Sequence, residues 1–293
     1  MDPAEIAAEL LRAEAARTQI APFTDAFPDL DVETAYAAQA AFIAAKLAAG
    51  DILVGAKLGL TSRAKQQAMG VSEPLYGMIT SSMLAPYGEP VDRAALIHPR
   101  AEPEIAFLLA RDVTAPATVT SVLAATEVVF AAVDILDSRY DNFRFRLPDV
   151  VADNASSGRI ILGPDPRKPS ELVDLRLLGC VLRANGNVVA TAAGAAVAGH
   201  PAASVAWMAN RLAERGQHLR AGWIVSSGSL TAPVPLEPGT VVTAELDGLG
   251  TVEVTTKLSV RPNAPGFLGS VRHIGHCPVT AWRPWRSPRF RPG

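Results

Sequence analysis

Two glutamates at the start of a strongly apolar segment are the first residues whose types and spacing could do chemistry. Glu102 and Glu104 are separated by one residue, and the segment IAFLLA begins directly after the second. Residues i and i+2 of a β-strand point to the same face, so the pattern places two carboxylates side by side. Such a pair repels unless a cation joins it, and hard oxygen ligands favour Mg²⁺ or Mn²⁺ over zinc. Two solvated glutamates at the start of a strand fit these residues equally well.

A third carboxylate, Asp134, lies within the apolar segment 128–136. A carboxylate in so apolar a segment is rarely buried unless it is paired or bound to a metal. An ion pair between Asp134 and Arg139, or a turn at the end of a strand, would also account for it. Together with Glu102 and Glu104, however, Asp134 favours a site in which three carboxylates hold one octahedral Mg²⁺.

Lys57 is one of only five lysines in the chain, and it lies between glycines and aliphatic residues in the segment 54–60. A lysine removed from water can act in acid–base or electrostatic roles. The neighbouring glycines let a ligand approach the backbone closely. The segment does not match the P-loop pattern, and a lysine that reaches out of a strand into water is the structural alternative.

Two clusters of small polar residues could bind a carboxylate or an oxyanion. Asn154 and Ser156 lie between two apolar segments, where they suit either a substrate-carboxylate pocket or a tight turn. Ser227 and Gly228 follow the apolar segment 223–225 and offer hydroxyl and amide donors for an oxyanion. The chain contains no GxSxG motif, which argues against a serine hydrolase.

The elements that must position these residues are helices in the first third of the chain and mostly strands afterwards. Helical periodicity covers residues 3–17 and 32–49, with a proline-containing linker at 21–31 between them. Two further helices are expected at 62–69 and 201–215. Strands are expected at 51–60, 104–110, 128–136, 159–162, 181–190, 223–227, 241–247 and 251–255. This order lacks a regular βαβ alternation and therefore predicts an α+β fold.

The composition predicts a globular protein and excludes several classes. Hydrophobic residues make up 49% of the 293 residues and charged residues 19%, the opposite of a disordered chain. The net charge of −2 supplies no basic field for nucleic acid, and no uncharged apolar run is long enough for a membrane span. Cys180 and Cys277 form neither a disulfide framework nor a zinc motif. With no signal-peptide pattern at the N-terminus, a cytoplasmic protein is expected.

Taken in order, these segments resemble the 2-oxo-acid hydratase/decarboxylase branch of the fumarylacetoacetase-like family. The matching motifs are Lys57-Leu58-Gly59-Leu60-Thr61-Ser62, Ile97-His98-Pro99-Arg100 with Glu102 and Glu104, Asp137-Ser138-Arg139, residues 151–157 and Gly199-His200-Pro201. The motifs are specific as a set, and they cover most of the chain before its last 37 residues. The resemblance implies a mixed β-sheet roll with an N-terminal helical segment.

The resemblance also implies roles for individual residues. It implies that Glu102, Glu104 and Asp134 hold Mg²⁺ or Mn²⁺, and that Lys57 is the active-site lysine. Relatives more often have a glutamate at the position of Asp134, and many carry an acidic residue shortly after the motif that matches Tyr76-Gly77, where this chain has none. Arg139 and His200 are the candidates for recognising a distal substrate carboxylate. The expected substrate-binding residues are Leu60, Ser62, Asn154, Ser156, Ser227 and Gly228.

The implied activity is metal-dependent decarboxylation of 2-oxo-3-hexenedioate (4-oxalocrotonate) to 2-hydroxypenta-2,4-dienoate, in meta-cleavage catabolism of aromatic compounds. The segment 137–145 is similar to the decarboxylases of the branch. Hydration of 2-hydroxypenta-2,4-dienoate is the main alternative, followed by a C–C hydrolase for acylpyruvates and a non-catalytic partner subunit. The implied partners are a small 2-oxo dicarboxylic acid, further copies in a homo-oligomer and a paired hydratase.

A change in composition divides the chain. Residues 257–293 contain seven cationic residues, six prolines and no acidic residue. We expect residues 1–256 to form the catalytic domain, with its helical part at about 1–50, and residues 257–293 to be an Arg- and Pro-rich tail without fixed structure. A basic arm that binds an anionic partner is the alternative for this tail.

Overall fold

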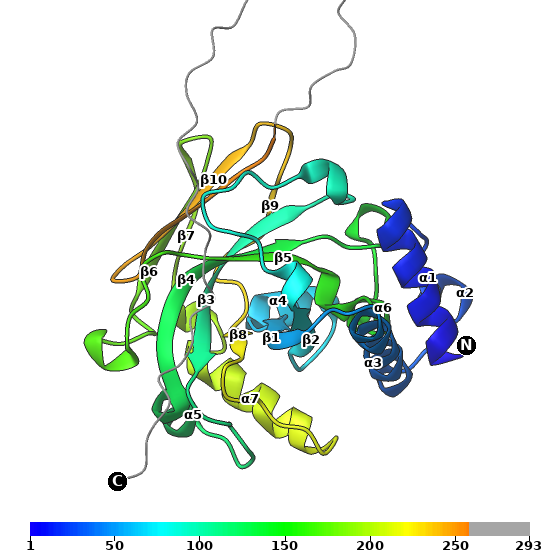
Figure 1. Ribbon diagram of the computed structural model, residues 1–293, viewed down its shortest axis with the longest axis horizontal. Coiled ribbons are helices and arrows are strands. Elements are labelled where there is room, and N and C mark those ends of the chain that lie inside the picture. The colour runs from blue at the N-terminus through cyan, green and yellow to red at the C-terminus, as the bar shows by residue number, and fades with distance from the viewer. Residues whose placement is uncertain (258–293) are drawn as a thin grey trace, which may run out of the picture. The chain divides into compact units, whose positions relative to one another are not determined.

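The computed structural model describes residues 1–257, so the predicted tail lies outside the described residues except for Lys257. The described chain is α+β, as predicted, with N-terminal helices followed by two β-sheets (Figure 1). The helices lie at one end of the larger sheet, and the smaller sheet lies on the side away from them (Figure 1).

The N-terminal helices begin where the sequence provides side-chain caps. Their bounds are α1 Pro3–Ala16, α2 Phe23–Ala26 and α3 Val32–Ala48. The carboxylate of Asp2 accepts from the backbone N–H of Ala4 at 2.9 Å, and that of Asp31 accepts from Thr34 at 2.7 Å. The predicted helices at 3–17 and 32–49 are confirmed, whereas the predicted linker at 21–31 contains the short helix α2.

The larger sheet has seven strands in the order β2-β1-β8-β3-β4-β5, with β9 pairing with β3. Their bounds are β1 Leu53–Gly59, β2 Leu75–Thr80, β3 Arg100–Leu109, β4 Thr126–Leu136, β5 Ser157–Leu162, β8 Ile224–Ser226 and β9 Val234–Pro235. The pair β1/β8 is parallel, and the other pairs are antiparallel. The sheet is therefore mixed, as predicted.

Strand β2, like the two-residue strand β9, is an element of this sheet that the sequence patterns do not predict. It is buried along its whole length and pairs with β1, with Gly77 opposite Lys57. Pro74 precedes the strand and Gly77 interrupts it, which weakens its strand pattern. A Cβ atom at Gly77 would lie 2.6 Å from the carbonyl oxygen of Asn154, so the close approach of these two backbones requires glycine.

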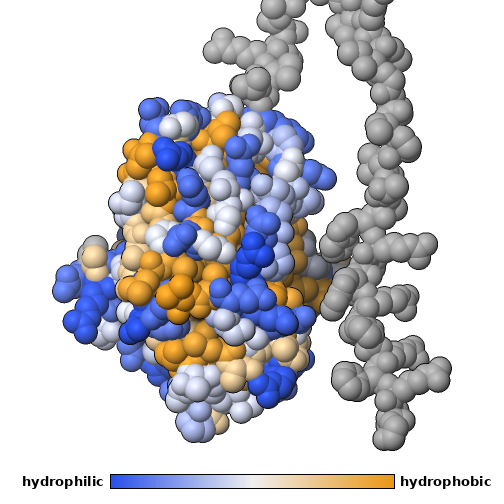
Figure 2. All heavy atoms as spheres, turned by 90° about the vertical axis from the view of Figure 1, so that its left-hand side faces the viewer, coloured by the Kyte–Doolittle hydropathy of each residue, from blue (hydrophilic) through white to orange (hydrophobic). Residues whose placement is uncertain are grey.

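The smaller sheet consists of two hairpins in the order β11-β10-β6-β7. The bounds are β6 Gly179–Ala184, β7 Asn187–Ala193, β10 Val241–Leu246 and β11 Gly250–Thr255. Asn185 and Gly186 both have positive φ in the turn between β6 and β7, which confirms the predicted hairpin. This sheet lies on the side of the molecule that Figure 2 turns to the viewer, where apolar patches alternate with hydrophilic ones.

The remaining helices connect the strands. The α-helices are α4 Arg63–Met69, α5 Val119–Ala125, α6 Leu147–Ala152 and α7 Pro201–Ala213. The 3₁₀ turns are η1 Ser81–Met83, η2 Arg93–Ala95, η3 Asp141–Phe143, η4 Asn154–Ser156, η5 Pro169–Glu171 and η6 Gly194–Ala196. Helices α4 and α7 confirm the predictions at 62–69 and 201–215. Within residues 1–257, no helix is both long enough and apolar enough to cross a membrane.

A buried ion pair fixes the turn after α6 against the end of β4. The guanidinium group of Arg139 pairs with Asp153 and also donates to the carbonyl oxygens of Asp137 and Ser157, each at 2.8 Å. Burial raises the pKa of Asp153 to about 6, and the charge of Arg139 opposes this rise. The interpretation that Arg139 pairs with Asp134 is therefore wrong, because the Arg139 side chain is already occupied by the backbone and by Asp153.

We expect Asp153→Ala to lower the free energy of unfolding by about 3–5 kcal/mol, because it leaves the buried charge of Arg139 without a partner. Urea unfolding followed by circular dichroism measures the loss. Asp25→Ala is the matched control, since it removes the partner of Arg144 in an exposed ion pair and should cost much less. If the two variants were equally stable, the pair of Arg139 and Asp153 would have no special structural role.

Candidate metal and substrate site

Three carboxylates meet in the interior because β3 and β4 are antiparallel neighbours. The register places Glu102 directly opposite Asp134, and Glu104 lies two residues further along β3. One carboxylate oxygen from each of the three residues lies within 4.8 Å of the other two. All three side chains are buried. The structure thus brings together the three residues that the sequence predicts as metal ligands.

The carboxylate oxygens of this cluster are only partly satisfied by protein donors. Oε2 of Glu104 accepts from the hydroxyl of Ser226 and from the backbone N–H of Gly228 at 2.9 Å. Oε1 of Glu104 and Oδ1 of Asp134 are buried without a hydrogen-bond partner. Buried oxygens without donors are costly unless a cation is bound. An all-carboxylate set of this kind fits Mg²⁺ or Mn²⁺.

Two lysines balance part of the negative charge. Lys57 on β1 is fully buried, forms an ion pair with Asp134 and donates to the carbonyl oxygen of Ala155 at 3.1 Å. Lys65 on α4 donates to Oε1 of Glu102 at 2.7 Å, and its side chain is 29% exposed. Lys57 therefore lies inside the protein, whereas Lys65 lies on the solvent side of the same cluster.

A left-handed turn holds the carbonyl group that Lys57 contacts. Asn154, Ala155 and Ser156 have φ values of 52°, 56° and 52°, a conformation that costs non-glycine residues about 1 kcal/mol or more each. The side-chain amide of Asn154 offsets this cost by bonding to both backbone groups of Met78, at 2.7 and 2.8 Å. Backbone strain of this kind concentrates at functional sites.

Two of the carboxylates, Glu102 and Asp134, and both lysines line a small cavity of about 100 Å³. The rest of its wall is largely apolar and includes Leu75, Leu136, Phe143, Phe145 and Val150. Phe143 is held from outside the cavity by the guanidinium group of Arg100, 3.9 Å from the ring centroid, and by the ring of His98. A small organic anion could thus place its charged end on the polar residues and its carbon chain against the apolar wall.

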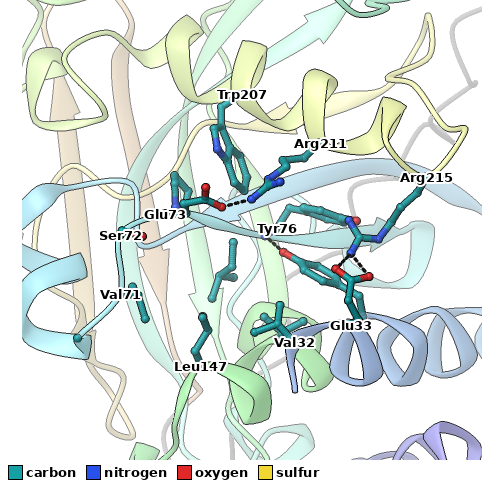
Figure 3. A pocket seen from close by; sticks show the side chains of 15 residues that line it. Val32, Glu33, Val71, Ser72, Glu73, Tyr76, Leu147, Trp207, Arg211 and Arg215 are labelled. Carbon is teal, nitrogen blue, oxygen red and sulfur yellow. Dashed lines mark hydrogen bonds and ion pairs between the residues drawn. The ribbon is translucent and has the colours of Figure 1, made fainter. Parts of the chain in front are cut away.

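A larger cavity of about 650 Å³ also has Leu75 in its lining; Figure 3 shows this cavity. It is rich in charged and aromatic side chains, but its two arginines are already paired. Arg211 pairs with Glu73, and Arg215 pairs with both carboxylate oxygens of Glu33, at 2.7 and 2.8 Å (Figure 3). Leu75 lines both cavities. The smaller cavity is the one lined by the metal-ligand candidates Glu102 and Asp134.

Two of the three predicted catalytic residues lie elsewhere. Arg139 is buried beneath the cavity wall, and its bonds to Asp153 and to carbonyl groups leave it no access to a ligand. His200 caps α7, where its Nδ1 accepts from the backbone N–H of Ala202 at 3.0 Å, and it lines a different cavity. The prediction that either residue recognises a distal substrate carboxylate is corrected by these positions.

The predicted substrate-binding residues divide into two groups. Leu60 and Ser156 line the cavity. Ser62 instead caps α4 by accepting from the N–H of Lys65 at 3.2 Å. Ser227 is fully buried outside the cavity lining. Asn154 supports the left-handed turn, and Gly228 supports Glu104, so these two act behind the cavity.

The position of Gly228 requires a glycine. Its φ is +101°, and a Cβ atom there would collide with the side chain of Thr61. Only with this backbone can its N–H reach Glu104. The N–H of Gly228, which was predicted to bind an oxyanion, therefore donates to the carboxylate of Glu104 instead.

Many relatives carry an acidic residue shortly after the motif that matches Tyr76-Gly77. This chain has none, and the residues in that place do not reach the cavity. Ser81 and Ser82 occupy that part of the chain, and both hydroxyl groups donate to Asp51, at 2.6 and 2.5 Å. None of these residues lines the cavity. Lys65 and the two phenylalanines of the wall are the residues that the sequence reasoning did not assign. The signal for Lys65 was its place in the first turn of a helix that begins directly after the strand of Lys57.

Burial controls the protonation of the cluster. Burial raises the pKa of Glu104 to about 8, and the negative charge of Asp134 adds to this rise. Burial also raises the pKa of Asp134, although the charge of Lys57 opposes the effect. Without a metal, Glu104 therefore holds a proton at neutral pH.

Comparisons with known proteins identify relatives of this chain. A sequence profile described as "Fumarylacetoacetate (FAA) hydrolase C-terminal" matches residues 42–257. The chain is 46% identical over 230 residues to a 4-oxalocrotonate decarboxylase of Pseudomonas sp. strain CF600, covering 78% of this chain and 87% of the relative. It is 39% identical over 249 residues to a 2-keto-4-pentenoate hydratase of Paraburkholderia xenovorans strain LB400, covering 85% and 92%. The predicted resemblance is thereby confirmed.

A solved structure shows the same fold with a metal present. It is the 4-oxalocrotonate decarboxylase from Pseudomonas putida G7, complexed with magnesium and adipate, with a TM-score of 0.84 and 42% identity. The match covers 87% of this chain and 97% of that chain. A second structure of that enzyme is complexed with calcium and acetate.

We expect Mg²⁺ to bind more tightly as the pH rises from about 6 to about 8, by roughly tenfold per pH unit, because the cation must displace the proton of Glu104. The sign follows from a raised pKa: the neutral form of Glu104 predominates below about 8. Calorimetric titration with MgCl₂ in two buffers of different ionisation enthalpy measures the protons released. Glu104→Gln should bind weakly and without this pH dependence, and an affinity independent of pH in the unchanged protein would contradict the assignment.

Proposed function

The chain belongs to the fumarylacetoacetate (FAA) hydrolase C-terminal family, and from that membership we propose that it is a lyase that decarboxylates 2-oxo-3-hexenedioate (4-oxalocrotonate). The product would be 2-hydroxypenta-2,4-dienoate, in meta-cleavage catabolism of aromatic compounds. The observation that carries the proposal is the buried cluster of Glu102, Glu104 and Asp134 beside Lys57, next to a cavity with a largely apolar wall. The decarboxylases at 46% and 42% identity support it.

Glu102, Glu104 and Asp134 are the proposed ligands of a divalent cation, Mg²⁺ or Mn²⁺. Support comes from the oxygens of Glu104 and Asp134 that lack protein donors, and from the magnesium in the solved relative. When bound, the cation supplies Lewis-acid stabilisation of negative charge on a 2-oxo acid. Asp134 is one methylene shorter than a glutamate, and its ion pair with Lys57 fixes where its carboxylate lies.

Lys57 is the proposed catalytic residue of the chain. In the reaction, the bond to the distal carboxylate breaks, its electron pair moves along the conjugated carbon chain to the C2 oxygen, and CO₂ leaves. That oxygen then takes up one proton. Lys57 lines the cavity beside Asp134, where its ammonium group can stabilise the growing negative charge and hold the proton. The carbonyl oxygen of Ala155 keeps this group in place.

The apolar wall has a complementary role. A carboxylate loses CO₂ more readily when it is removed from water, because the product of this step is neutral and the charge moves away. Phe143, Phe145, Leu75 and Val150 would exclude water from the carbon chain that carries that carboxylate. We assign Leu60 and Ser156 as substrate contacts in the same cavity, with Ser62, Asn154, Ser227 and Gly228 supporting them from behind.

Hydration of 2-hydroxypenta-2,4-dienoate is the second candidate, because hydratases at 39% identity share the family and most of their length with this chain. The same metal ligands and Lys57 would serve it. Hydration also needs a group that activates water. The carboxylates that line the cavity, Glu102 and Asp134, are both proposed metal ligands and so would not be free to activate water, which favours the decarboxylase.

Association with other chains belongs to the proposal as well. We propose a homo-oligomer that can associate with a paired hydratase. Val173, Leu177, Val188 and Val189 are apolar side chains that remain at least 49% exposed in this single chain. The last two lie on β7, at the edge of the smaller sheet. Such exposed apolar groups are typical of surfaces that contact other chains. A cytoplasmic location stays a prediction.

The purified chain with MgCl₂ should release CO₂ from 2-oxo-3-hexenedioate, measured with a coupled bicarbonate assay. Glu104→Gln should lower the rate at least about a hundredfold, because one ligand loses its charge, while its circular dichroism spectrum stays unchanged. Glu245→Gln is the control, since Glu245 is exposed on β10, which belongs to the smaller sheet and does not contribute to the cluster. Hydration of 2-hydroxypenta-2,4-dienoate without CO₂ release would replace this function by the second candidate.

A chain that ends at Lys257 should keep the full rate of CO₂ release. All the proposed metal, catalytic and substrate residues lie before this point, and the last described strand, β11, ends at Thr255. Comparing kcat/KM for the full chain and for the chain without residues 258–293 measures the contribution of the tail. A large loss of activity would show that the catalytic domain does not end near residue 256.

A further inference from the structure

The described residues that line the small cavity include two cations, Lys57 and Lys65. Lys57 is fully buried and contacts two oxygens, one from Asp134 and one from Ala155. Lys65 is partly exposed, and the partner of its ammonium group is Oε1 of Glu102. If Lys57 left its partners, a buried charge would remain unpaired. Lys65 is partly exposed to solvent, so its ammonium group can exchange Glu102 for another partner without this cost.

The nearby arginines are not available for a ligand in this cavity. Arg211 and Arg215 belong to the larger cavity and are paired with Glu73 and Glu33 (Figure 3). Arg139 is buried in its pair with Asp153. Arg100 stacks on the ring of Phe143 but does not line the cavity. Of the cations that do line it, Lys65 is the one that could recognise a second negative charge.

Metal binding would release Lys65 from its present partner. Glu102 is one of the three proposed ligands, and a divalent cation on its carboxylate competes with the ammonium group and repels it. Three carboxylates and two lysines already bring the cluster close to neutrality. A divalent cation would change the net charge of the cluster from −1 to +1, which the metal-binding carboxylate of a ligand balances. A second, distal carboxylate therefore needs a cation of its own, and the released ammonium group of Lys65 would supply it.

We propose that Lys65 is the residue that selects dicarboxylic 2-oxo acids, by binding the carboxylate distal to the 2-oxo group once the metal has taken its place on Glu102. This inference rests on the proposed function. Lys65 is a positioning residue in this account, since its contact must break before the distal carboxylate leaves as CO₂.

The test compares two ligands with the same metal-chelating end. 2-Oxoadipate carries a distal carboxylate and 2-oxohexanoate does not, and neither has the double bond that allows loss of CO₂. Calorimetry with Mg²⁺ present should show that Lys65→Met weakens binding of 2-oxoadipate by at least about tenfold, the value of a charge-assisted hydrogen bond. Binding of 2-oxohexanoate should change less than about twofold. Lys65→Arg should retain most of the preference.

Mg²⁺ alone and the variant Arg63→Met serve as controls. Lys65→Met should bind Mg²⁺ as tightly as the unchanged protein or more tightly, because a competitor for Glu102 is removed. Arg63 lies on the same helix but lines a different cavity, so Arg63→Met should leave the affinity for both ligands unchanged. With 2-oxo-3-hexenedioate, Lys65→Met should raise KM and leave kcat unchanged or higher.

Equal weakening of both ligands, or weakening of neither, would overturn the role of Lys65. Weaker Mg²⁺ binding by Lys65→Met would also overturn it, because Lys65 would then support the metal site itself. These results differ from failure of the proposed function, which would appear as no CO₂ release by the unchanged protein. Even in that case, the affinities for the two ligands would measure the selectivity of the site, because neither ligand has to react.

Discussion

Three carboxylates buried within 4.8 Å of one another are the constraint on which the site depends. Negative charges so close together in the interior are unfavourable unless cations and donors surround them. Lys57 from β1, Lys65 from α4 and the N–H of Gly228 after β8 all converge on this point. The sheet order places β8 between β1 and β3, and β3 beside β4, so these groups come from neighbouring strands.

The sequence predicts the core of this site well because the relevant signals are local. Alternation along a strand places Glu102 and Glu104 on one face, and the apolar setting of Asp134 and Lys57 marks both as buried. The roles of Arg139 and His200 could not be read in the same way. Their motifs are shared with relatives, but a motif does not say whether a side chain faces a cavity, and here one serves an internal ion pair and the other a helix cap.

The parts of the fold that were not predicted depend on contacts between distant segments. Strand β2 exists because it pairs with β1 and because Asn154 bonds to Met78, 76 residues away in the chain. Its local sequence, interrupted by a glycine, carries a weak strand signal. The wall formed by Phe143 and Phe145 is likewise a product of tertiary packing, since Phe143 ends the short turn η3 and Phe145 lies between this turn and α6.

The left-handed backbone around the cavity limits how this pocket can evolve. Leu60, Phe143, Ala155 and Ser156 all line it and all have φ near +55°. Branched side chains such as valine and isoleucine are poorly tolerated in this conformation, so these four positions can exchange only among a narrow set of residue types. Variation in pocket shape must therefore come mainly from wall residues with ordinary backbone, such as Leu75, Leu136 and Val150. Proteins with this fold would therefore change substrate through substitutions at a small number of positions, while the backbone that positions the metal ligands and Lys57 stays the same.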